Sequence, residues 1–417
     1  MYLTLAVLSA FAFVYGVVAT RVERTPVNGP VIFLAFGILA GPHVLGLLDL
    51  SVQGEEMRIV AELTLALVLF TDSANADLAT LRRSIRIPQR MLLIGLPLTL
   101  AFGFGVGMLL FPDLPLFTVA ILATILAPTD AALGKAVVTN EAVPAPVREA
   151  LNVESGLNDG ICVPILFTFL ALAAGTDGSA AEIALGLVAE EIGIGLGVGV
   201  GLSVAGRYAL RASADRGWIE EPWTQIPVVV LALTCFGVAQ AAGGSGFIAC
   251  FTGGLAFGGL VKQHKELLMS RAEGSGNLLS LLTWVMFGTA VVGKYIGDLD
   301  WRIVTYSLLS LTVIRMLPVS LSLLGIGMRW DAQLFLGWFG PRGLASIVFV
   351  VIAMGQNVTG SDTLAATVVC TVTLSVLGHG LSANPLSAAF SARALSDPTL
   401  RPRAQGGDEG GHSHSDR

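Results

Sequence analysis

Thirteen mostly apolar stretches, separated by short polar loops, constrain this chain more than any other feature of its sequence. A helix needs about 20 mostly apolar residues to cross a bilayer, and within lipid only helices and closed barrels satisfy every backbone polar group. The stretches are residues 2–19, 28–48, 57–72, 90–111, 116–138, 147–174, 183–206, 225–242, 246–261, 279–297, 303–325, 332–355 and 362–388. The sequence therefore predicts an all-α membrane protein with about 13 transmembrane helices.

The composition points to the same surroundings. Charged residues make up 13% of the 417 residues and the hydrophobic set 54%, whereas a soluble domain carries about 25% charged residues. The net charge of −6 is scattered through the loops, with no basic stripe interleaved with aromatic side chains, so nucleic acid is excluded as a partner. The four cysteines lie far apart inside apolar stretches, which fits neither a disulfide framework nor a CxxC metal site.

The lysines and arginines favour one side of the membrane. With thirteen spans, most of the 24 basic residues fall on the side of the odd-numbered loops and the C-terminal tail, whereas only Arg58, Lys294 and Arg302 fall on the opposite side. Loops rich in Lys and Arg stay in the cytoplasm. This asymmetry predicts a multi-pass protein of the inner (cytoplasmic) membrane with its N-terminus outside and its C-terminus in the cytoplasm. The polar, Gly-rich stretch 391–417 is expected to be a disordered cytoplasmic tail.

A proline interrupts the fifth apolar stretch. Pro128 removes a backbone donor and clashes with the preceding turn, and Thr129 and Asp130 follow it directly. Freed backbone groups are tolerated at mid-membrane only where they are buried in protein or line a cavity, and broken helices commonly bind ions. Thr129 and Asp130 are therefore candidate ion ligands.

The sixth stretch carries a polar face on an otherwise apolar helix. At 100° per residue, Glu154 and Asn158 lie about 40° apart, and so do Ser155 and Asp159. These four side chains share one side of the helix. Their oxygens suit a hard cation, which prefers carboxylate, hydroxyl and carbonyl ligands.

The second half of the chain repeats the pattern of the first. The segment Phe339-Gly340-Pro341-Arg342-Gly343 interrupts the twelfth stretch as Pro128 interrupts the fifth. Counting from the first and the eighth stretch gives two units of six helices, each broken in its fifth member. Because the seventh helix inverts the second unit, this pattern indicates two inverted six-helix repeats with crossed discontinuous helices and a binding site at the crossing.

The charges inside the membrane can be given partners. Each costs about 2.5 to 3.5 kcal/mol at a helix centre, so Arg315 of the eleventh stretch needs a carboxylate, and we assign Glu154 to it. Arg342 is expected either to neutralise the ends of the broken helices or to take part in gating. Asp159 remains free, and burial close to Asp130 would let a proton compete there with a cation. Such competition, combined with alternating access, gives antiport without covalent chemistry.

These residues resemble the motifs of the monovalent cation:proton antiporters, in particular the NhaP and NHE-like (Na+/H+ exchanger) branch. The matching stretches are Ala127 to Asp130, Asn152 to Gly160, Phe339 to Gly343 and His379 to Leu386. The resemblance implies an NhaA-like fold and exchange of Na+ or Li+ for H+. It also implies that Asp159 carries ion and proton, that Na+ binds at Asp159, Asp130, Ser155 and Thr129 with Asn158 nearby, and that Glu154 and Arg315 form a structural ion pair.

The resemblance further implies a homodimer in which a core moves against a fixed scaffold. The implied parts are scaffold and dimerisation helices 1 to 3 (1–89), core helices 4 to 6 (90–175), linker helix 7 with scaffold helices 8 to 10 (176–300), and core helices 11 to 13 (301–390). The electrogenic branch has Asp where Asn158 stands and usually Lys where Arg315 stands, so electroneutral exchange is expected. No cofactor is expected besides the transported ions.

Four further polar residues are open to two interpretations. Glu62 and Asp72 lie in or at the end of the third stretch, where an interface location is favoured over ion coordination. His43 and His379 could sense pH, since an unperturbed imidazole titrates near pH 6.5. Packing beside helix ends is the simpler interpretation of both histidines.

Three alternative functions remain. A K+/H+ antiporter would have the same fold, because the choice among Na+, Li+ and K+ depends on cavity size. A more remote alternative, an intramembrane aspartyl hydrolase, would pair Asp130 with Asp159, yet the chain has no second catalytic motif such as Gly-x-Gly-Asp. A passive channel would need neither inverted breaks nor a carboxylate that also binds protons.

Overall fold

The computed structural model describes residues 2–23, 25, 27, 29–48, 55–76, 86–130, 133–138, 140, 142–174, 178–219, 226–261, 265–356 and 358–395. All regular secondary structure in these residues is helical. The first half contains α1 (Tyr2–Glu23), α2 (Gly29–Ala40), α3 (Glu55–Asn75), α5 (Arg86–Arg90), η1 (Met91–Gly95), α6 (Leu96–Leu110), α7 (Leu116–Ile125), α8 (Lys135–Val138) and α9 (Ala145–Ala174). The second half contains α10 (Gly178–Asp215), α11 (Pro227–Ala241), α12 (Gly246–Leu260), α13 (Lys265–Met286), η3 (Phe287–Val292), α14 (Gly293–Tyr295), η4 (Ile296–Asp298), α15 (Trp301–Leu311), α16 (Val313–Ser322), α17 (Trp330–Trp338), α18 (Leu344–Gly355) and α19 (Ser361–Leu395).

Each of the thirteen expected stretches coincides with a helix or with a run of helices along the chain. Seven helical segments in the described residues are long and apolar enough to cross a membrane, and five further apolar helices are shorter. The all-α membrane fold is therefore confirmed, while the number of crossings stays a prediction. Helix α19 continues to Leu395, past residue 391 where the tail was expected to begin. The rest of the expected tail lies outside the described residues.

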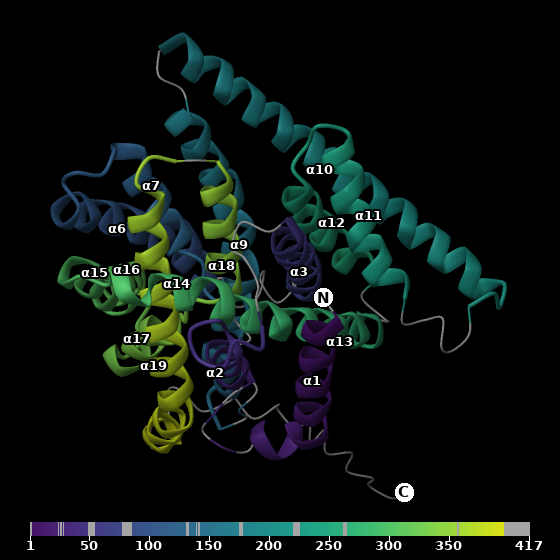
Figure 1. The fold of residues 1–417 in the computed structure, drawn as a ribbon. Helices are drawn as coiled ribbons and strands as arrows, with labels where there is room; N and C mark the ends of the chain where they lie inside the picture. Colours follow the sequence, from purple (N-terminus) through teal and green to yellow (C-terminus); the bar gives the residue numbers. More distant parts are fainter. Residues whose placement is uncertain are drawn as a thin grey trace, which may run out of the picture.

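Two groups of helices pack around a shared centre (Figure 1). In one group, α10 packs on α12, α12 packs on α3, and α13 packs on α2 and α3. In the other group, α6 packs on α7 and α16, and α15 packs on α19. Helices α3, α9 and α18 pack against one another where the two groups meet.

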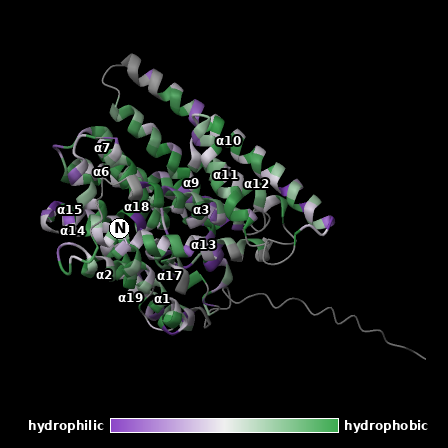
Figure 2. Cartoon of the chain, turned by 45° about the vertical axis from the view of Figure 1, so that its right-hand side comes forward, coloured by the Kyte–Doolittle hydropathy of each residue, from purple (hydrophilic) through white to green (hydrophobic). Residues whose placement is uncertain are grey.

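Hydrophobic side chains face outward as well as inward. Figure 2 shows hydrophobic residues along most of the helices, with hydrophilic residues in shorter stretches between them. Leu109 on α6 and Phe13 on α1, for example, keep 82% and 73% of their surface exposed. In water such a surface would drive aggregation, whereas in a bilayer it meets lipid tails. The arrangement fits the membrane location that the sequence predicts.

Both expected helix breaks are present. Helix α7 ends at Ile125, three residues before Pro128, and α17 ends at Trp338, three residues before Pro341. A third interruption, at Thr312 between α15 and α16, was not foreseen. There the Thr312 hydroxyl donates to the carbonyl of Leu308 at 2.6 Å, which satisfies an acceptor at the helix end.

Candidate functional site

The two helix breaks lie side by side and are bonded to each other. The backbone N–H of Asp130 in the first break donates to the carbonyl of Pro341 in the second at 2.8 Å. The hydroxyl of Ser346 on α18 donates to the carbonyl of Ile125 at the end of α7, at 2.7 Å. The crossing that the prolines predict is therefore a hydrogen-bonded junction.

The carboxylate of Asp130 holds two helix starts at this crossing. Its Oδ2 accepts from the backbone N–H of Leu344, the first residue of α18, at 2.9 Å, and its Oδ1 accepts from Leu133 N–H, before α8, at 3.2 Å. The free amides and positive dipole at a helix N-terminus favour an anion there. A Cβ atom at position 343 would lie 2.0 Å from Oδ2 of Asp130, so this approach requires Gly343.

Arg342 places a positive charge on the carbonyl side of the crossing. Its buried guanidinium donates through Nη1 to the carbonyl of Ala127 and, at 3.1 Å, to that of Pro128. Its backbone N–H donates to the Ser375 hydroxyl of α19 at 2.7 Å. The crossing thus has an anion at its free amides and a cation at its free carbonyls.

Three uncharged polar side chains meet beside the crossing. The hydroxyls of Thr129 and Ser155 lie 3.0 Å apart, and Nδ2 of Asn158 donates to Oγ1 of Thr129 at 2.7 Å. All three side chains are buried. The first break and the polar face of α9 are therefore brought together, as the sequence predicts.

The carboxylate of Asp159 has a buried oxygen that accepts no hydrogen bond from the described residues. The residue is 7% exposed, and its Oδ1 has no hydrogen-bond partner among the described residues. The same is true of Oδ1 of Asn158, one helix position before it. A buried acceptor that loses water and gains no partner is costly, which favours a site filled by a ligand. Carboxylate, amide and hydroxyl oxygens are the ligands that a hard cation prefers.

Asp72 belongs to the same group of acidic residues, contrary to the interface location that the sequence favours. It lies on α3 where this helix packs on α9, and a Cβ atom at Gly156 would be 3.2 Å from the Asp72 carbonyl oxygen. Its carboxylate is close enough to those of Asp130 and Asp159 for these like charges to repel one another. The glycine at position 156, between polar residues of α9, is the one sequence feature that could have indicated this approach.

Glu154 and Arg315 form a bidentate ion pair away from water. Nη1 of Arg315 lies 2.5 Å from Oε1 of Glu154 and Nη2 lies 2.6 Å from Oε2, and both residues are 1% exposed. Two parallel charge-assisted bonds of this kind are strong and geometrically specific. The pair joins α9 to α16, and Gly340 of the second break packs directly against the guanidinium.

The remaining polar residues lie elsewhere. His379 on α19 is buried beside the end of α17, with Nε2 2.8 Å from the carbonyl of Trp338 and Nδ1 2.9 Å from that of Ser375. His43 is exposed in the turn that follows α2. Glu62 is paired with Arg58 near the start of α3.

No conventional metal centre accompanies the crossing. Within the part of the chain that the structure describes, no group of three or more His, Cys, Asp or Glu residues could hold a metal ion. Ligands for a cation at Asp159 would therefore include the neutral oxygens of Thr129, Ser155 and Asn158.

An apolar helical bundle with crossed, broken helices and buried carboxylates at the crossing is an architecture typical of secondary transporters. The family model of the transmembrane part of sodium/hydrogen exchangers matches residues 8–389. The chain therefore belongs to the sodium/hydrogen exchanger family.

Curated relatives agree with this assignment. The Na(+)/H(+) antiporter 2 of Zygosaccharomyces rouxii is 25% identical over 380 residues, which cover 83% of this chain and 45% of that protein. The K(+)/H(+) antiporter NhaP2 of Shewanella sp. (strain ANA-3) is 24% identical over 385 residues, which cover 91% of this chain and 65% of that protein. The chain thus spans less than half of the first relative and under two thirds of the second.

The fold has also been seen before. The sodium proton antiporter MjNhaP1 from Methanocaldococcus jannaschii, solved at pH 8, matches with a TM-score of 0.74 over 93% of this chain and 98% of that chain. The sequence identity is 18%. The match shows that the two proteins share a fold.

Proposed function

We propose that this protein exchanges Na+ or Li+ for H+ across the cytoplasmic membrane, with Asp159 as the group for which the two ions compete. The observation that carries the proposal is the buried Oδ1 of Asp159 beside the crossed helix breaks, which has no hydrogen-bond partner in the part of the chain that the structure describes. The family assignment and the names of the relatives support it. K+ is the alternative cation, because relatives named K(+)/H(+) antiporter cover 91% of the chain.

A bound Na+ would be held by oxygens from α9, from α3 and from the first helix break. Asp159 supplies the charge, Ser155 and Thr129 supply hydroxyls, and the free Oδ1 of Asn158 lies one residue before Asp159. Asp72 would add a second carboxylate from α3. Asp130, whose two oxygens each accept a backbone amide, would act mainly through its charge. No cofactor enters this scheme.

Exchange follows when one carboxylate serves two ions. A cation bound to the Asp159 carboxylate leaves no place for a proton, and protonation removes the charge that holds the cation. If the protein changes between its outward-open and inward-open forms only when the site holds a cation or a proton, each cation carried in one direction requires a proton carried in the other. If Asp159 alone among these carboxylates exchanges its proton for the cation, and with Asn158 neutral, the exchange would be electroneutral.

The two helix groups described above are the candidates for the scaffold and the core that the family resemblance implies. We propose that residues 90–175 and 301–390 form a moving core, that 1–89 and 176–300 form the linker and scaffold, and that the scaffold supports a homodimer. Contacts between loops agree with the expected grouping of the loops at the two ends of the molecule. Nη1 of Arg90 donates to the carbonyl of Leu324 at the end expected inside, and Arg302 lies 3.7 Å from Asp113 at the end expected outside.

The proposal is tested with purified protein in proteoliposomes that hold an imposed pH gradient. Addition of Na+ or Li+ is expected to dissipate the gradient, and the rate should be the same with the membrane potential clamped at zero or at a negative value. K+ is tested in parallel, and choline is the control for ionic strength. A gradient that none of the three cations dissipates would contradict antiport, and a rate that follows the potential would contradict electroneutrality.

A further inference from the structure

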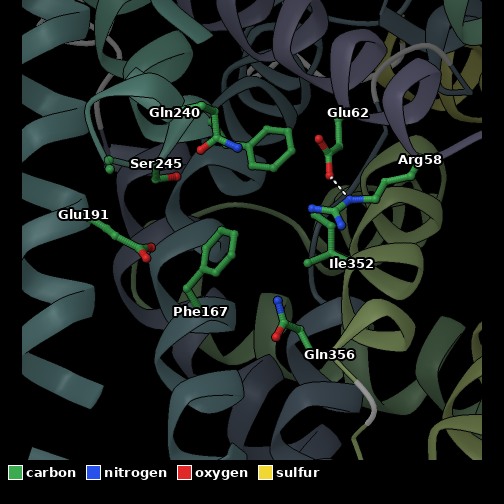
Figure 3. A pocket seen from close by; sticks show the side chains of 11 residues that line it. Arg58, Glu62, Phe167, Glu191, Gln240, Ser245, Ile352 and Gln356 are labelled. Atoms are coloured by element: carbon green, nitrogen blue, oxygen red, sulfur yellow. Dashed lines mark hydrogen bonds and ion pairs between the residues drawn. The ribbon is translucent and has the colours of Figure 1, made fainter. Parts of the chain in front are cut away.

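A cavity of about 280 Å³ lies between the two helix groups, at the end of the bundle that the proposed orientation places outside. Figure 3 shows the side chains that line it. Its charged residues are Arg58 and Glu62 on one wall and Glu191 on the opposite wall, and the side chains of Gln240, Gln356 and Ser245 complete its polar lining. None of these residues takes part in the crossing described above.

Three helices, α3, α9 and α18, line both the cavity and the crossing. On α3, Glu62 precedes Asp72 by ten residues, and on α9, Phe167 of the cavity follows Asp159 by eight. On α18, the cavity residue Ile352 follows the start of the helix by eight residues. At 1.5 Å per residue, all three helices place the cavity about 12 to 15 Å from the crossing.

A layer of apolar side chains separates the cavity from the crossing. These side chains occupy the stretches of α3, α9 and α18 between the two sites, and they belong to one cluster of buried residues. The members are Leu65, Leu69, Val163, Leu166, Ile347, Val348 and Val351. These side chains lie in the way of an ion that moves from the cavity to Asp159. A shift of α9 and α18 against α3, of the kind that alternating access requires, would open the way.

The ion pair in the cavity is unequally exposed. Nε of Arg58 lies 2.6 Å from Oε1 of Glu62, one helical turn away on α3. The Arg58 side chain is 55% exposed, whereas that of Glu62 is 13% exposed. The arginine can swing into water on its flexible stem, but the glutamate stays in the cavity. Without the guanidinium, a carboxylate in this position would attract another cation.

We propose that the cavity is the outer mouth of the transport path and that Arg58 occupies Glu62 as a tethered counter-cation, which an arriving Na+ or Li+ displaces. The inference rests on the exchange function proposed above. Two carboxylates against one guanidinium leave the lining negative, which favours cations over anions. Arg58 therefore sets the apparent affinity for the cation on the outer side, and leaves the inner side unaffected.

The test compares apparent KM values for Na+ in right-side-out and everted vesicles. Arg58→Gln is expected to lower the KM on the outer side about two- to fivefold, the factor that corresponds to a partly exposed ion pair, with kcat unchanged. Glu62→Gln is expected to raise the outer KM by a similar factor. Neither substitution should change the KM measured in everted vesicles.

Arg302→Gln is the matched control, because Arg302 lies at the same end of the molecule but outside the cavity. If Arg302→Gln lowers the outer KM as much as Arg58→Gln does, general surface charge explains the effect and the inference fails. It also fails if Arg58→Gln leaves the outer KM unchanged. Absence of exchange by the wild-type protein would instead refute the proposed function, so the two failures are distinct.

A second measurement does not depend on the charge of Arg58. The four native cysteines are buried, so a cysteine introduced as Gln356→Cys is the group that a membrane-impermeant thiol reagent would reach from outside. Modification there is expected to reduce exchange by more than half, whereas modification of Arg302→Cys should leave it unchanged. Full activity after labelling of the Gln356→Cys variant would exclude the cavity from the path.

Discussion

Substitution Asp159→Asn is expected to abolish the collapse of a pH gradient that Na+ causes in vesicles carrying the wild-type protein. Asn has nearly the same shape as Asp but neither binds a proton in the physiological range nor carries a negative charge. The Oδ1 position, which is buried and accepts no hydrogen bond from the described residues of the wild type, would be kept, so the variant should fold. Exchange is measured as the rate of gradient dissipation at saturating Na+.

Asp113→Asn is the matched control for this experiment. It removes the same charge from a side chain that is 91% exposed and remote from the crossing, and it is expected to retain the wild-type rate. If Asp159→Asn also retained exchange, Asp159 would not carry the ion. Asp72, the other carboxylate that faces the crossing, would then be the next candidate.

Substitution Glu154→Gln is expected to lower the free energy of unfolding by about 3 to 5 kcal/mol, the usual cost of removing one partner of a buried ion pair. The Arg315 guanidinium would remain 1% exposed and would have no anion against it. Thermal or denaturant unfolding of the purified protein in detergent micelles measures the effect.

A double variant separates the contribution of the ion pair to stability from the cost of leaving one charge unpaired. Glu154→Leu combined with Arg315→Met removes both charges, and it is expected to be far more stable than Glu154→Gln, because no buried charge is left unpaired. A double variant as unstable as the sum of its single variants would show that the two side chains act independently. Wild-type stability of Glu154→Gln would show that the pair does not hold the fold.

The helix breaks could be predicted because their cause is local. Pro128 and Pro341 each remove a backbone donor from an apolar helix, and the chain can bury the freed groups only against each other. The pairing of Glu154 with Arg315 was also within reach, since few charges occur in the apolar stretches and each needs a partner. Both predictions follow because lipid supplies neither hydrogen-bond partners nor counter-charges.

Other features depend on tertiary contacts that no local pattern reveals. Asp72 stands at the end of an apolar stretch, and the sequence of such a stretch is the same whether the carboxylate faces the membrane surface or another helix. The packing of α3 on Gly156 is what distinguishes these two locations. The two helix starts held by Asp130 belong to segments more than 200 positions apart in the chain. Sequence alone could place Asp130 at a break but could not show that its oxygens were already engaged.

The division of charge at the crossing explains why Asp159 is the free group. Asp130 is bonded to two helix starts, Arg342 to the carbonyls of the first break, and Glu154 to Arg315. Each of these charges has a fixed partner in the protein. Asp159 alone among them has a buried oxygen that no described donor reaches, so its charge can be met by an ion from outside the protein.

The most direct test of this account is proton release on cation binding. Purified wild-type protein in weakly buffered detergent solution is titrated with NaCl, with choline chloride as the control, while the pH is recorded. Competition at one carboxylate predicts that Na+ binding releases up to one proton per chain and that Asp159→Asn releases none. Na+ binding to the wild-type protein without any proton release, or equal release by the Asp159→Asn variant, would contradict it.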